Sequence, residues 1–321
     1  MTSISNLDAA AGLSAAENDP PGTGRARGVF GRARAASGAL FMAPNLVLVT
    51  IFLILPLVLT VVYSLQKINP LGGSQWLGVN NYTDLFQDSI FWQSLQNTVV
   101  FTIVTVPLSM GLGLALATLL NGFMPGRAIY RSIIFLPLVI SGVATGVIGQ
   151  FLFDENNGFV NKLLASLGFT GPHWQSDGFW AMVSIMIVTV WQRVGFAMII
   201  YLAGLQGVDP QMLEAATVDG ATTWQRFRRV TFPLLGPSTF FLLIMNIIYS
   251  FQVFDTVWAM TRGGPGFSTT TLVTDAYRTA FDDHGPQELG YGAAIGIVIY
   301  AITLIITVVQ WKASKNRDEA G

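Results

Sequence analysis

The chain has 321 residues, of which 52% are hydrophobic and only 11% are charged, and its mean hydropathy is +0.54. Because roughly a quarter of the residues in a soluble domain are charged, this composition argues against a soluble enzyme and points to a membrane protein. The net charge of −1 gives no general attraction to nucleic acid, and the absence of cysteine excludes disulfides, thiolate metal sites and a cysteine nucleophile.

Residues 1–37 are rich in Ala, Gly, Ser and Arg, which predicts a disordered cytoplasmic tail. A cleaved signal peptide is the competing interpretation. The apolar run that follows the arginines is too long for the core of a signal peptide, and no small-residue cleavage site comes after it. We therefore expect this run to be retained as the first membrane span.

Six apolar segments are long enough to cross a membrane, since a helix needs about 20 apolar residues to span about 30 Å of hydrocarbon. The predicted spans cover Leu40–Leu65, Ser94–Leu120, Tyr130–Phe153, Phe179–Gly204, Leu235–Met260 and Leu289–Trp311. They predict an all-α polytopic membrane protein with six transmembrane helices in one domain over residues 38–312, followed by a cytoplasmic tail over residues 313–321.

Basic residues indicate the side of the membrane that each loop faces, because cytoplasmic loops collect Lys and Arg. Twelve of the 17 Lys and Arg lie in the N-terminal segment, the second and fourth loops and the C-terminal tail. Four lie in the other loops, and Arg193 lies inside a span. This asymmetry predicts that both termini are cytoplasmic.

Proline and glycine inside the spans predict kinks and close packing. Pro56, Pro107 and Pro137 each remove one backbone hydrogen bond and predict kinks in the first, second and third spans. Gly142 with Gly146, and Gly111 with Ala115, form small-residue faces of the kind that lets helices approach closely in lipid.

The fourth loop, residues 206–233, predicts two short helices at the cytoplasmic surface. Asp209 can cap a helix that begins at Pro210, and Gly220 can end it. A second helix with three arginines is expected to stop before Pro233. The first helix has almost no core of its own, so we expect it to enter a groove on a partner protein. An amphipathic helix on the membrane surface is the alternative.

Polar side chains at membrane depth mark a candidate solute path. Arg193 lies about 11 residues, roughly 16 Å, from the cytoplasmic end of the fourth span, and an ionisable residue at that depth is a functional hypothesis. Polar residues three or four apart form a stripe on the fifth span, flanked by one carboxylate. The predicted path residues are Arg193, Asn246, Tyr249, Gln252 and Asp255, with Thr256 continuing the stripe. The alternative is hydrogen bonding between helices, with Arg193 satisfied by a carbonyl or by a carboxylate of another subunit.

The fourth loop resembles the EAA loop of ABC importer permeases, because Glu214-Ala215-Ala216 is followed by Gly220 and then by Pro233 at the family's spacing. Asp219-Gly220-Ala221 and the Gly-Gly-Pro segment within Met260–Leu272 are similar to the carbohydrate-type branch of that family. The resemblance covers residues from about 40 to 312.

Three segments of the last third of the chain are most similar to the glycerol-3-phosphate (Ugp-type) permeases: Phe254-Asp255-Thr256, Thr269–Leu272 and Tyr277-Arg278. This likeness implies that the solute is glycerol 3-phosphate or a glycerophosphodiester. A neutral oligosaccharide such as a maltodextrin or trehalose is the alternative. A proton-coupled secondary transporter is a third possibility from another class, but Asp255 is the single acid placed to serve it.

The resemblance implies the type I ABC importer permease fold and transport by alternating access in a bacterial inner membrane. The implied partners are a second homologous permease subunit, two ATPase subunits and an extracytoplasmic binding protein. The chain has no Gly-Lys-Ser/Thr phosphate loop, so ATP and Mg are expected on the ATPase, and this subunit is expected to be neither an enzyme nor a cofactor protein. His173 and His284 fall in predicted loops, and we expect no metal site.

The resemblance also assigns residue roles. The ATPase-coupling residues are Met212, Leu213, Glu214, Ala215, Ala216, Asp219, Gly220 and Pro233, and Glu214 is expected to pair with a basic residue of the ATPase. In related permeases the last outer loop reaches toward the binding protein. The corresponding residues here are Gly263, Gly264 and Pro265.

Overall fold

The computed structural model describes residues 42–68, 73–122, 124–281 and 288–318, with side chains described up to residue 312. The predicted N-terminal tail and His284 lie outside the described residues. The chain divides into two compact units, residues 1–58 and 59–321.

The described part of the first unit is helical and belongs to a helix, Met42–Ser64, that is long and apolar enough to cross a membrane. Within it, η1 (Thr50–Ile54) is a π-helical turn in which the Leu55 N–H bonds to the Thr50 carbonyl, and α2 (Leu55–Ser64) follows. Pro56 cannot donate a backbone hydrogen bond, and one wider turn lets the helix continue past it. The helix extends into the second unit.

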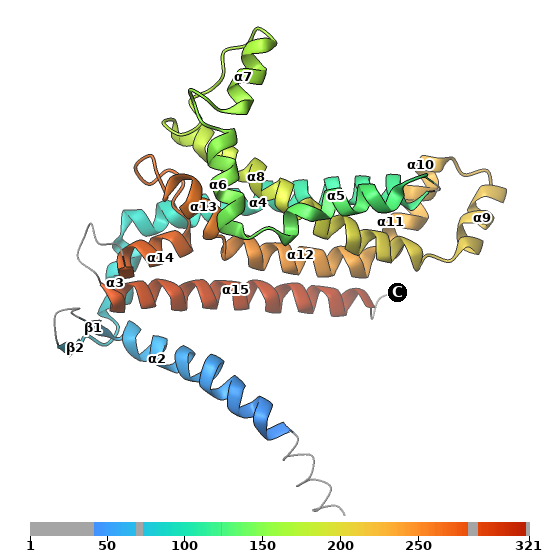
Figure 1. The fold of residues 1–321 in the computed structure, drawn as a ribbon. Helices are drawn as coiled ribbons and strands as arrows, with labels where there is room; N and C mark the ends of the chain where they lie inside the picture. The colour runs from blue at the N-terminus through green and yellow to red at the C-terminus, as the bar shows by residue number, and fades with distance from the viewer. Residues whose placement is uncertain (1–41, 69–72, 123, 282–287, 319–321) are drawn as a thin grey trace, which may run out of the picture. The chain divides into compact units, whose positions relative to one another are not determined.

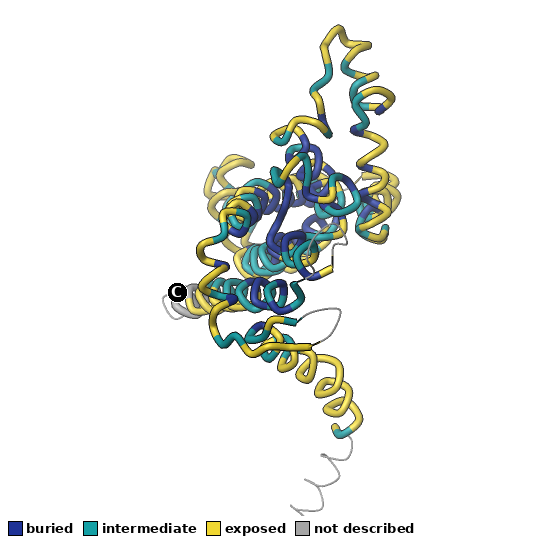
Figure 2. Tube along the Cα trace, turned by 90° about the vertical axis from the view of Figure 1, so that its left-hand side faces the viewer, coloured by how far each residue is buried: buried dark blue, intermediate teal, exposed yellow. Residues whose placement is uncertain are grey.

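Three further helices in the described residues are long and apolar enough to cross a membrane: α4 (Ser89–Asn121), α8 (Gly178–Gln206) and α15 (Leu289–Asp318). With Met42–Ser64, they confirm the predicted first, second, fourth and sixth spans as continuous helices. Figure 1 shows α4, α8, α12 and α15 running alongside one another. Buried apolar side chains of α4, α8 and α12 form one core cluster, and those of α15 belong to a second cluster with Phe251 of α12. Figure 2 colours the buried residues dark blue, and they gather in the middle of the second unit.

The third predicted span is not one helix kinked at Pro137. It is a pair, α5 (Arg127–Val139) and α6 (Gly142–Leu152), bent by 100°. Pro137 lies inside α5, and the break falls just after the end of that helix, at Ile140 and Ser141, whose ψ angles of 137° and 141° are not helical. The new direction of α6 follows from its packing: a Cβ on Gly146 would lie 2.6 Å from the Cβ of Ala259 in α13, so α6 rests almost directly on that helix.

The fifth predicted span starts where the sequence indicates, with α12 (Gly236–Phe251), but it is broken after Phe251. A helical stretch made of α10 (Thr223–Arg226), η2 (Phe227–Thr231) and α11 (Phe232–Leu234) precedes α12 and is bent by 65° against it. This stretch runs through Pro233 instead of stopping before it, because Pro233 occupies the first turn of α11, where its missing N–H is tolerated.

After Phe251 the chain leaves the helix for three residues and restarts as α13 (Asp255–Thr261). The Val253 carbonyl in this gap accepts a hydrogen bond from the Thr271 hydroxyl, 3.1 Å away. A contact with a residue 18 positions further on thus replaces helical bonding at the break, so the predicted single helix to Met260 is wrong.

The shorter elements connect the spans. They are β1 (Gln66–Ile68) paired antiparallel with β2 (Ser74–Trp76), and helices α3 (Asn80–Gln87), α7 (Phe159–Ser166), α9 (Pro210–Val218) and α14 (Leu272–Phe281). In the β pair, Gln66 lies opposite Trp76.

Close packing of α4 on α8 depends on Gly113 and not on the predicted Gly111–Ala115 face. A Cβ added to Gly113 would lie 2.5 Å from the Cβ of Ala197 and 2.9 Å from the backbone nitrogen of Met198, whereas no heavy atom lies within 4 Å of a Cβ added to Gly111. The predicted Gly142–Gly146 face, in contrast, is confirmed as a packing face.

We therefore expect Gly113→Ala to lower the thermal midpoint of the purified chain, because overpacking a helix contact costs about 1–3 kcal/mol. Gly111→Ala is the matched control on the same helix, and its midpoint should stay the same or rise, since alanine favours helix by about 1 kcal/mol over glycine. The measurement is thermal unfolding in detergent. Equal midpoints for the two variants would contradict the packing argument.

Candidate functional site

The predicted first cytoplasmic helix is present as α9, and its ends form as the sequence indicates. The Asp209 carboxylate accepts a hydrogen bond from the Gln211 N–H at 2.9 Å, and Pro210 is the first residue of the helix. At the other end Gly220 has φ +79°, a left-handed backbone that favours glycine. The Ala221 N–H then bonds back to the Ala216 carbonyl at 3.0 Å and closes the helix.

A groove of about 460 Å³ separates α9 from the helical stretch that leads to α12. It brings together several predicted coupling residues from the two sides of the loop, namely Met212, Ala215, Ala216 and Asp219 of α9 with Pro233 of α11. Leu213, Glu214 and Gly220 do not line it, and Glu214 is exposed on α9. The Arg226 guanidinium donates to the Thr217 hydroxyl at 2.7 Å and links the two helices.

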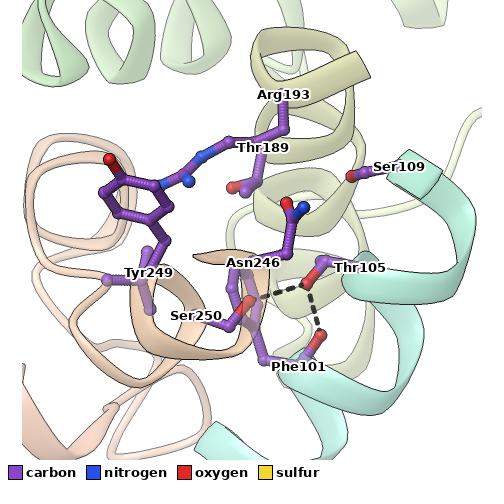
Figure 3. A pocket seen from close by; sticks show the side chains of 9 residues that line it. Phe101, Thr105, Ser109, Thr189, Arg193, Asn246, Tyr249 and Ser250 are labelled. Atoms are coloured by element: carbon purple, nitrogen blue, oxygen red, sulfur yellow. Dashed lines mark hydrogen bonds between the residues drawn. The ribbon is translucent and has the colours of Figure 1, made fainter. Parts of the chain in front are cut away.

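A second cavity, of about 360 Å³, lies among α5, α6, α8 and the break between α12 and α13. It gathers four of the predicted path residues, Arg193, Tyr249, Gln252 and Asp255. Asn246 lines a narrow pocket of about 10 Å³, room for about one water, that shares Arg193 and Tyr249 with the larger cavity (Figure 3).

Arg193 lies near the middle of α8, 13 residues or roughly 20 Å from Gln206 at the end of the helix. Its guanidinium carbon is 4.0 Å from the centre of the Tyr249 ring, a cation–π contact that Figure 3 shows. Within the described residues this guanidinium has no ion pair and no hydrogen bond. Beside it, the buried Thr189 hydroxyl also has no partner in that part of the chain. The cavity therefore contains a charge and a hydrogen-bonding group that the protein leaves unsatisfied.

The predicted stripe on the fifth span does not exist as one helix face. Asn246 and Tyr249 belong to α12, Gln252 is the residue that ends it, and Asp255 and Thr256 begin α13. The break, and not helical periodicity, places these residues around one cavity. Asn246 also differs from its neighbours, because it is buried and its amide donates to the Leu242 carbonyl of its own helix at 2.8 Å.

Several polar residues of the two pockets were not singled out from the sequence. They are Thr105 and Ser109 on α4, Thr189 and Gln192 on α8, and Ser250 on α12. On α4 a signal existed, because buried hydroxyls follow one face at steps of three and four residues. Each of Thr98, Thr102 and Thr105 donates to the carbonyl four residues before it. On α8 a single threonine in an apolar helix gives no such pattern.

The predicted binding-protein contact, Gly263, Gly264 and Pro265, lies in the loop between α13 and α14. Gly263 is buried with φ +87°, Gly264 and Pro265 are half-buried, and Gly266 at the tip is exposed. A Cβ on Gly263 would lie 2.6 Å from the Thr270 hydroxyl oxygen, so glycine is needed both for backbone conformation and for space.

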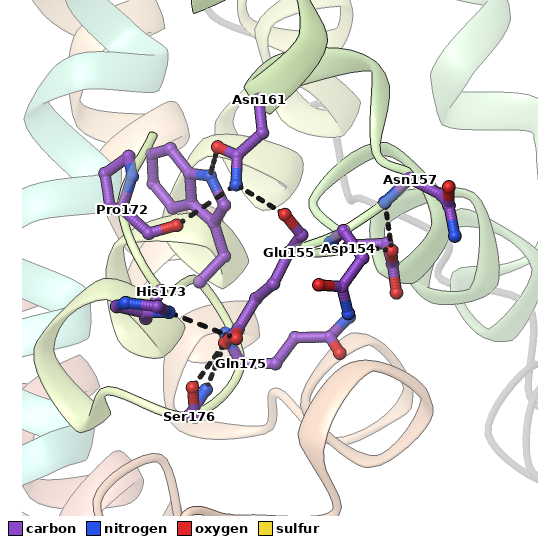
Figure 4. Close-up of polar contacts among 10 residues, drawn as sticks. Asp154, Glu155, Asn157, Asn161, Pro172, His173, Gln175 and Ser176 are labelled. Atoms are coloured by element: carbon purple, nitrogen blue, oxygen red, sulfur yellow. Dashed lines mark hydrogen bonds and ion pairs between the residues drawn. The ribbon is translucent and has the colours of Figure 1, made fainter. Parts of the chain in front are cut away.

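The connection between α6 and α8, residues 153–177, is organised around Glu155 (Figure 4). Its carboxylate accepts hydrogen bonds from the backbone N–H groups of Gln175 and Ser176, at 2.9 and 2.6 Å, and from the Ser176 hydroxyl at 2.6 Å. His173 Nδ1 lies 3.3 Å away. Chiefly the Ser176 hydroxyl, with the two backbone donors, lowers the pKa of Glu155 to about 2.

We expect this segment to loosen as the pH falls from about 4.5 toward about 2. Because the pKa of Glu155 is lower in the folded state than its ordinary value of 4.5, its stabilisation is present above pH 4.5 and lost toward pH 2. Glu155→Gln should already speed hydrogen–deuterium exchange of residues 153–177 at pH 7, corrected for the intrinsic rate. Lys162→Gln, a charge change in the same segment, is the control. Equal exchange in Glu155→Gln and the unsubstituted chain would contradict this role.

The chain is similar to permease subunits of transport systems that depend on a binding protein. Residues 109–312 match the family described as "Binding-protein-dependent transport system inner membrane component". The chain is 36% identical over 289 residues to the lactose transport system permease protein LacF of Rhizobium radiobacter, covering 88% of this chain and 95% of LacF. It is 35% identical over 282 residues to the sulfoquinovosyl glycerol transport system permease protein SmoG of Agrobacterium fabrum, covering 87% and 90%.

Similarity extends to a third relative and to a solved structure. The chain is 32% identical over 275 residues to the sn-glycerol-3-phosphate transport system permease protein UgpA of Yersinia pestis, covering 85% of this chain and 92% of UgpA. Its fold matches a chain in the crystal structure of a bacterial ABC transporter involved in the import of the acidic polysaccharide alginate. That match has a TM-score of 0.77 at 23% identity and covers 91% of this chain and 99% of that chain.

Proposed function

The chain belongs to the family of binding-protein-dependent transport system inner membrane components, and from this premise we propose that it forms half of the pathway of an ABC importer for glycerol 3-phosphate or a glycerophosphodiester. It is a multi-pass permease subunit of the inner membrane and is not itself catalytic. Its all-helical fold is that of the alginate transporter permease.

The observation that carries the solute assignment is the state of Arg193. Its guanidinium rests on Tyr249 and forms no ion pair within the described residues, yet it borders a cavity of about 360 Å³. A phosphate entering the cavity would meet a planar donor suited to two parallel, charge-assisted hydrogen bonds. The unpartnered Thr189 hydroxyl and the Gln252 amide would then serve the hydroxyl groups of the glycerol part.

The relatives support two solute classes. SmoG and UgpA are named for sulfoquinovosyl glycerol and sn-glycerol 3-phosphate, which carry a fixed negative charge on a sulfonate and a phosphate. LacF is named for lactose, which is neutral, and favours the second candidate, a neutral oligosaccharide such as a maltodextrin or trehalose. For a sugar, the exposed part of the Tyr249 ring would provide a stacking surface, and Arg193 would be a structural residue.

The transport cycle that we propose is alternating access. A second homologous permease subunit completes the pathway, two ATPase subunits bind ATP and Mg, and an extracytoplasmic binding protein delivers the solute. Closure of the ATPase dimer would carry α9 inward with Glu214 paired to a basic residue of the ATPase. In this arrangement both termini and the α9 groove face the cytoplasm, as the distribution of Lys and Arg predicts.

A proton-coupled transporter without an ATPase would need acidic relays at membrane depth. The narrow pocket and the larger cavity beside Arg193 are together called the membrane pockets. In the described residues Asp255 is the one carboxylate that lines them, and the family is binding-protein-dependent. Copurification of an ATPase subunit with this chain from its native membrane tests this point directly. Its absence in mild detergent would favour the proton-coupled alternative.

The experiment that tests the solute is ATP hydrolysis and uptake by the complex reconstituted with its binding protein. The panel is glycerol 3-phosphate, glycerophosphocholine, maltose and trehalose. Stimulation by the two phosphate compounds alone is the expected result. Stimulation by the sugars alone would overturn the phosphate assignment and establish the second candidate.

A further inference from the structure

We propose that Asn97 and Thr271 are positioning residues that tie the α13–α14 loop, residues 262–271, to two different walls of the membrane pockets. Through these ties, docking of a binding protein on the loop would be transmitted to the solute path. The inference rests on the proposed function, because contact of this loop with a binding protein is part of that proposal.

The loop is held rigid by its own side chains. The Thr269 hydroxyl donates to the Gly264 carbonyl at 2.8 Å, and the Thr270 hydroxyl donates to the Gly263 carbonyl at 3.0 Å. Thr269, Thr270 and Thr271 are fully buried, although they belong to a loop. These bonds close the base of the loop, and the Ser268 N–H and hydroxyl close its tip by donating to the Pro265 carbonyl at 3.1 and 2.8 Å. We therefore expect a force on the tip to move the loop as a unit.

The first tie joins the loop to α4. The Asn97 side-chain amide donates to two loop carbonyls, Phe267 at 3.0 Å and Thr270 at 2.9 Å, and thus uses both of its hydrogens. The neighbouring Thr98 hydroxyl accepts from the Leu272 N–H at 3.0 Å. One turn further along α4, Phe101 lines the narrow pocket that contains Arg193.

The second tie joins the loop to the break between α12 and α13. The Thr271 hydroxyl donates to the Val253 carbonyl at 3.1 Å. Val253 lines both the narrow pocket and the larger cavity, next to Tyr249. The loop therefore has hydrogen bonds to α4 on one side of the pockets and to the broken fifth span on another.

A rigid loop with two such ties couples its position to the separation of the two walls. Packed elements move between discrete arrangements and do not deform continuously, so a displacement at the loop is passed on and not absorbed. Asn97 and Thr271 touch neither the solute cavity nor the exposed tip. We therefore expect changes at these two residues to weaken the effect of binding-protein docking on the solute path, without changing the affinity for the solute or for the binding protein.

The test uses the complex reconstituted with its binding protein and solute. Asn97→Asp keeps the shape of the side chain but cannot donate to the two carbonyls, and Thr271→Val keeps the shape but lacks the hydroxyl. Each should lower the maximal solute-dependent stimulation of ATP hydrolysis about tenfold, the effect of roughly 1.4 kcal/mol. The basal ATPase rate, the yield of assembled complex and the half-maximal binding-protein concentration should stay unchanged.

Asn80→Asp and Thr83→Val on α3 are the matched controls, because both positions are exposed and the Thr83 hydroxyl bonds only within its own helix. Full stimulation of ATP hydrolysis in both Asn97→Asp and Thr271→Val would overturn the proposal. So would a change confined to the half-maximal binding-protein concentration, because that result assigns the residues to the shape of the docking surface. Lack of stimulation in the unsubstituted complex would instead overturn the proposed function on which the inference rests.

Discussion

Arg193→Gln in the reconstituted importer is expected to lower uptake of a phosphate-bearing solute by roughly 10- to 100-fold. A hydrogen bond to a charged group contributes about 1.5–3 kcal/mol, and each 1.4 kcal/mol corresponds to a factor of ten. The guanidinium has no ion pair within the described residues and rests on the Tyr249 ring. Its removal should therefore take away a contact to the solute and leave the basal ATPase rate unchanged.

Graded variants separate charge from geometry at this position. Arg193→Lys keeps the charge but loses the planar pair of donors, so its uptake should lie between those of the unsubstituted chain and Arg193→Gln. Tyr249→Phe keeps the ring that the guanidinium contacts and is the control for side-chain packing. Uptake of phosphate solutes at the normal rate by Arg193→Gln would show that Arg193 is a structural residue, as the hydrogen-bonding alternative holds.

The parts of the fold that the sequence predicts well are those determined by local composition. The apolar runs of α4, α8 and α15 are long enough to define spans by themselves. Asp209, Pro210 and Gly220 define the ends of α9, because capping and left-handed turns depend on the residue at the position itself. These signals need no knowledge of neighbouring helices.

The breaks in the third and fifth spans could not be predicted in this way. Hydropathy records how apolar a segment is and not the direction in which it runs. The turn before α6 depends on the packing of Gly146 against Ala259, and the break before α13 on the bond from Thr271 to Val253. The sequence also does not show that Gly113, and not the predicted Gly111, packs against α8, since only the position of Ala197 in the fold distinguishes the two glycines.

The residues of the membrane pockets were predicted only in part. Polarity at membrane depth is rare enough to single out Arg193, Tyr249, Gln252 and Asp255 from the sequence. The predicted helical face that would bring Tyr249, Gln252 and Asp255 together is wrong, because the chain breaks between Tyr249 and Asp255. Thr189 was missed, because a lone threonine in an apolar helix is usually satisfied by its own backbone, and here it is not.

Glu214→Ala is expected to reduce solute-stimulated ATP hydrolysis at least about tenfold. Glu214 is exposed on α9 and forms no ion pair within the described residues, whereas Met212, Ala215 and Ala216 turn toward the groove. A charge-assisted bond to a basic residue of the ATPase, worth about 1.5–3 kcal/mol, would be lost. Glu214→Gln keeps the shape and should be intermediate.

Gln211→Ala, on an exposed residue of the same helix, is the control for general effects on α9 and should leave stimulation unchanged. Gly220→Ala separates placement from contact. No heavy atom lies within 4 Å of its added Cβ, so it acts only through the strain of φ +79°, about 1–2 kcal/mol. If the α9 contact transmits the force, Glu214→Ala will uncouple an assembled complex, whereas Gly220→Ala will mainly lower the yield of assembly. Normal stimulation in Glu214→Ala would show that α9 is not the coupling helix.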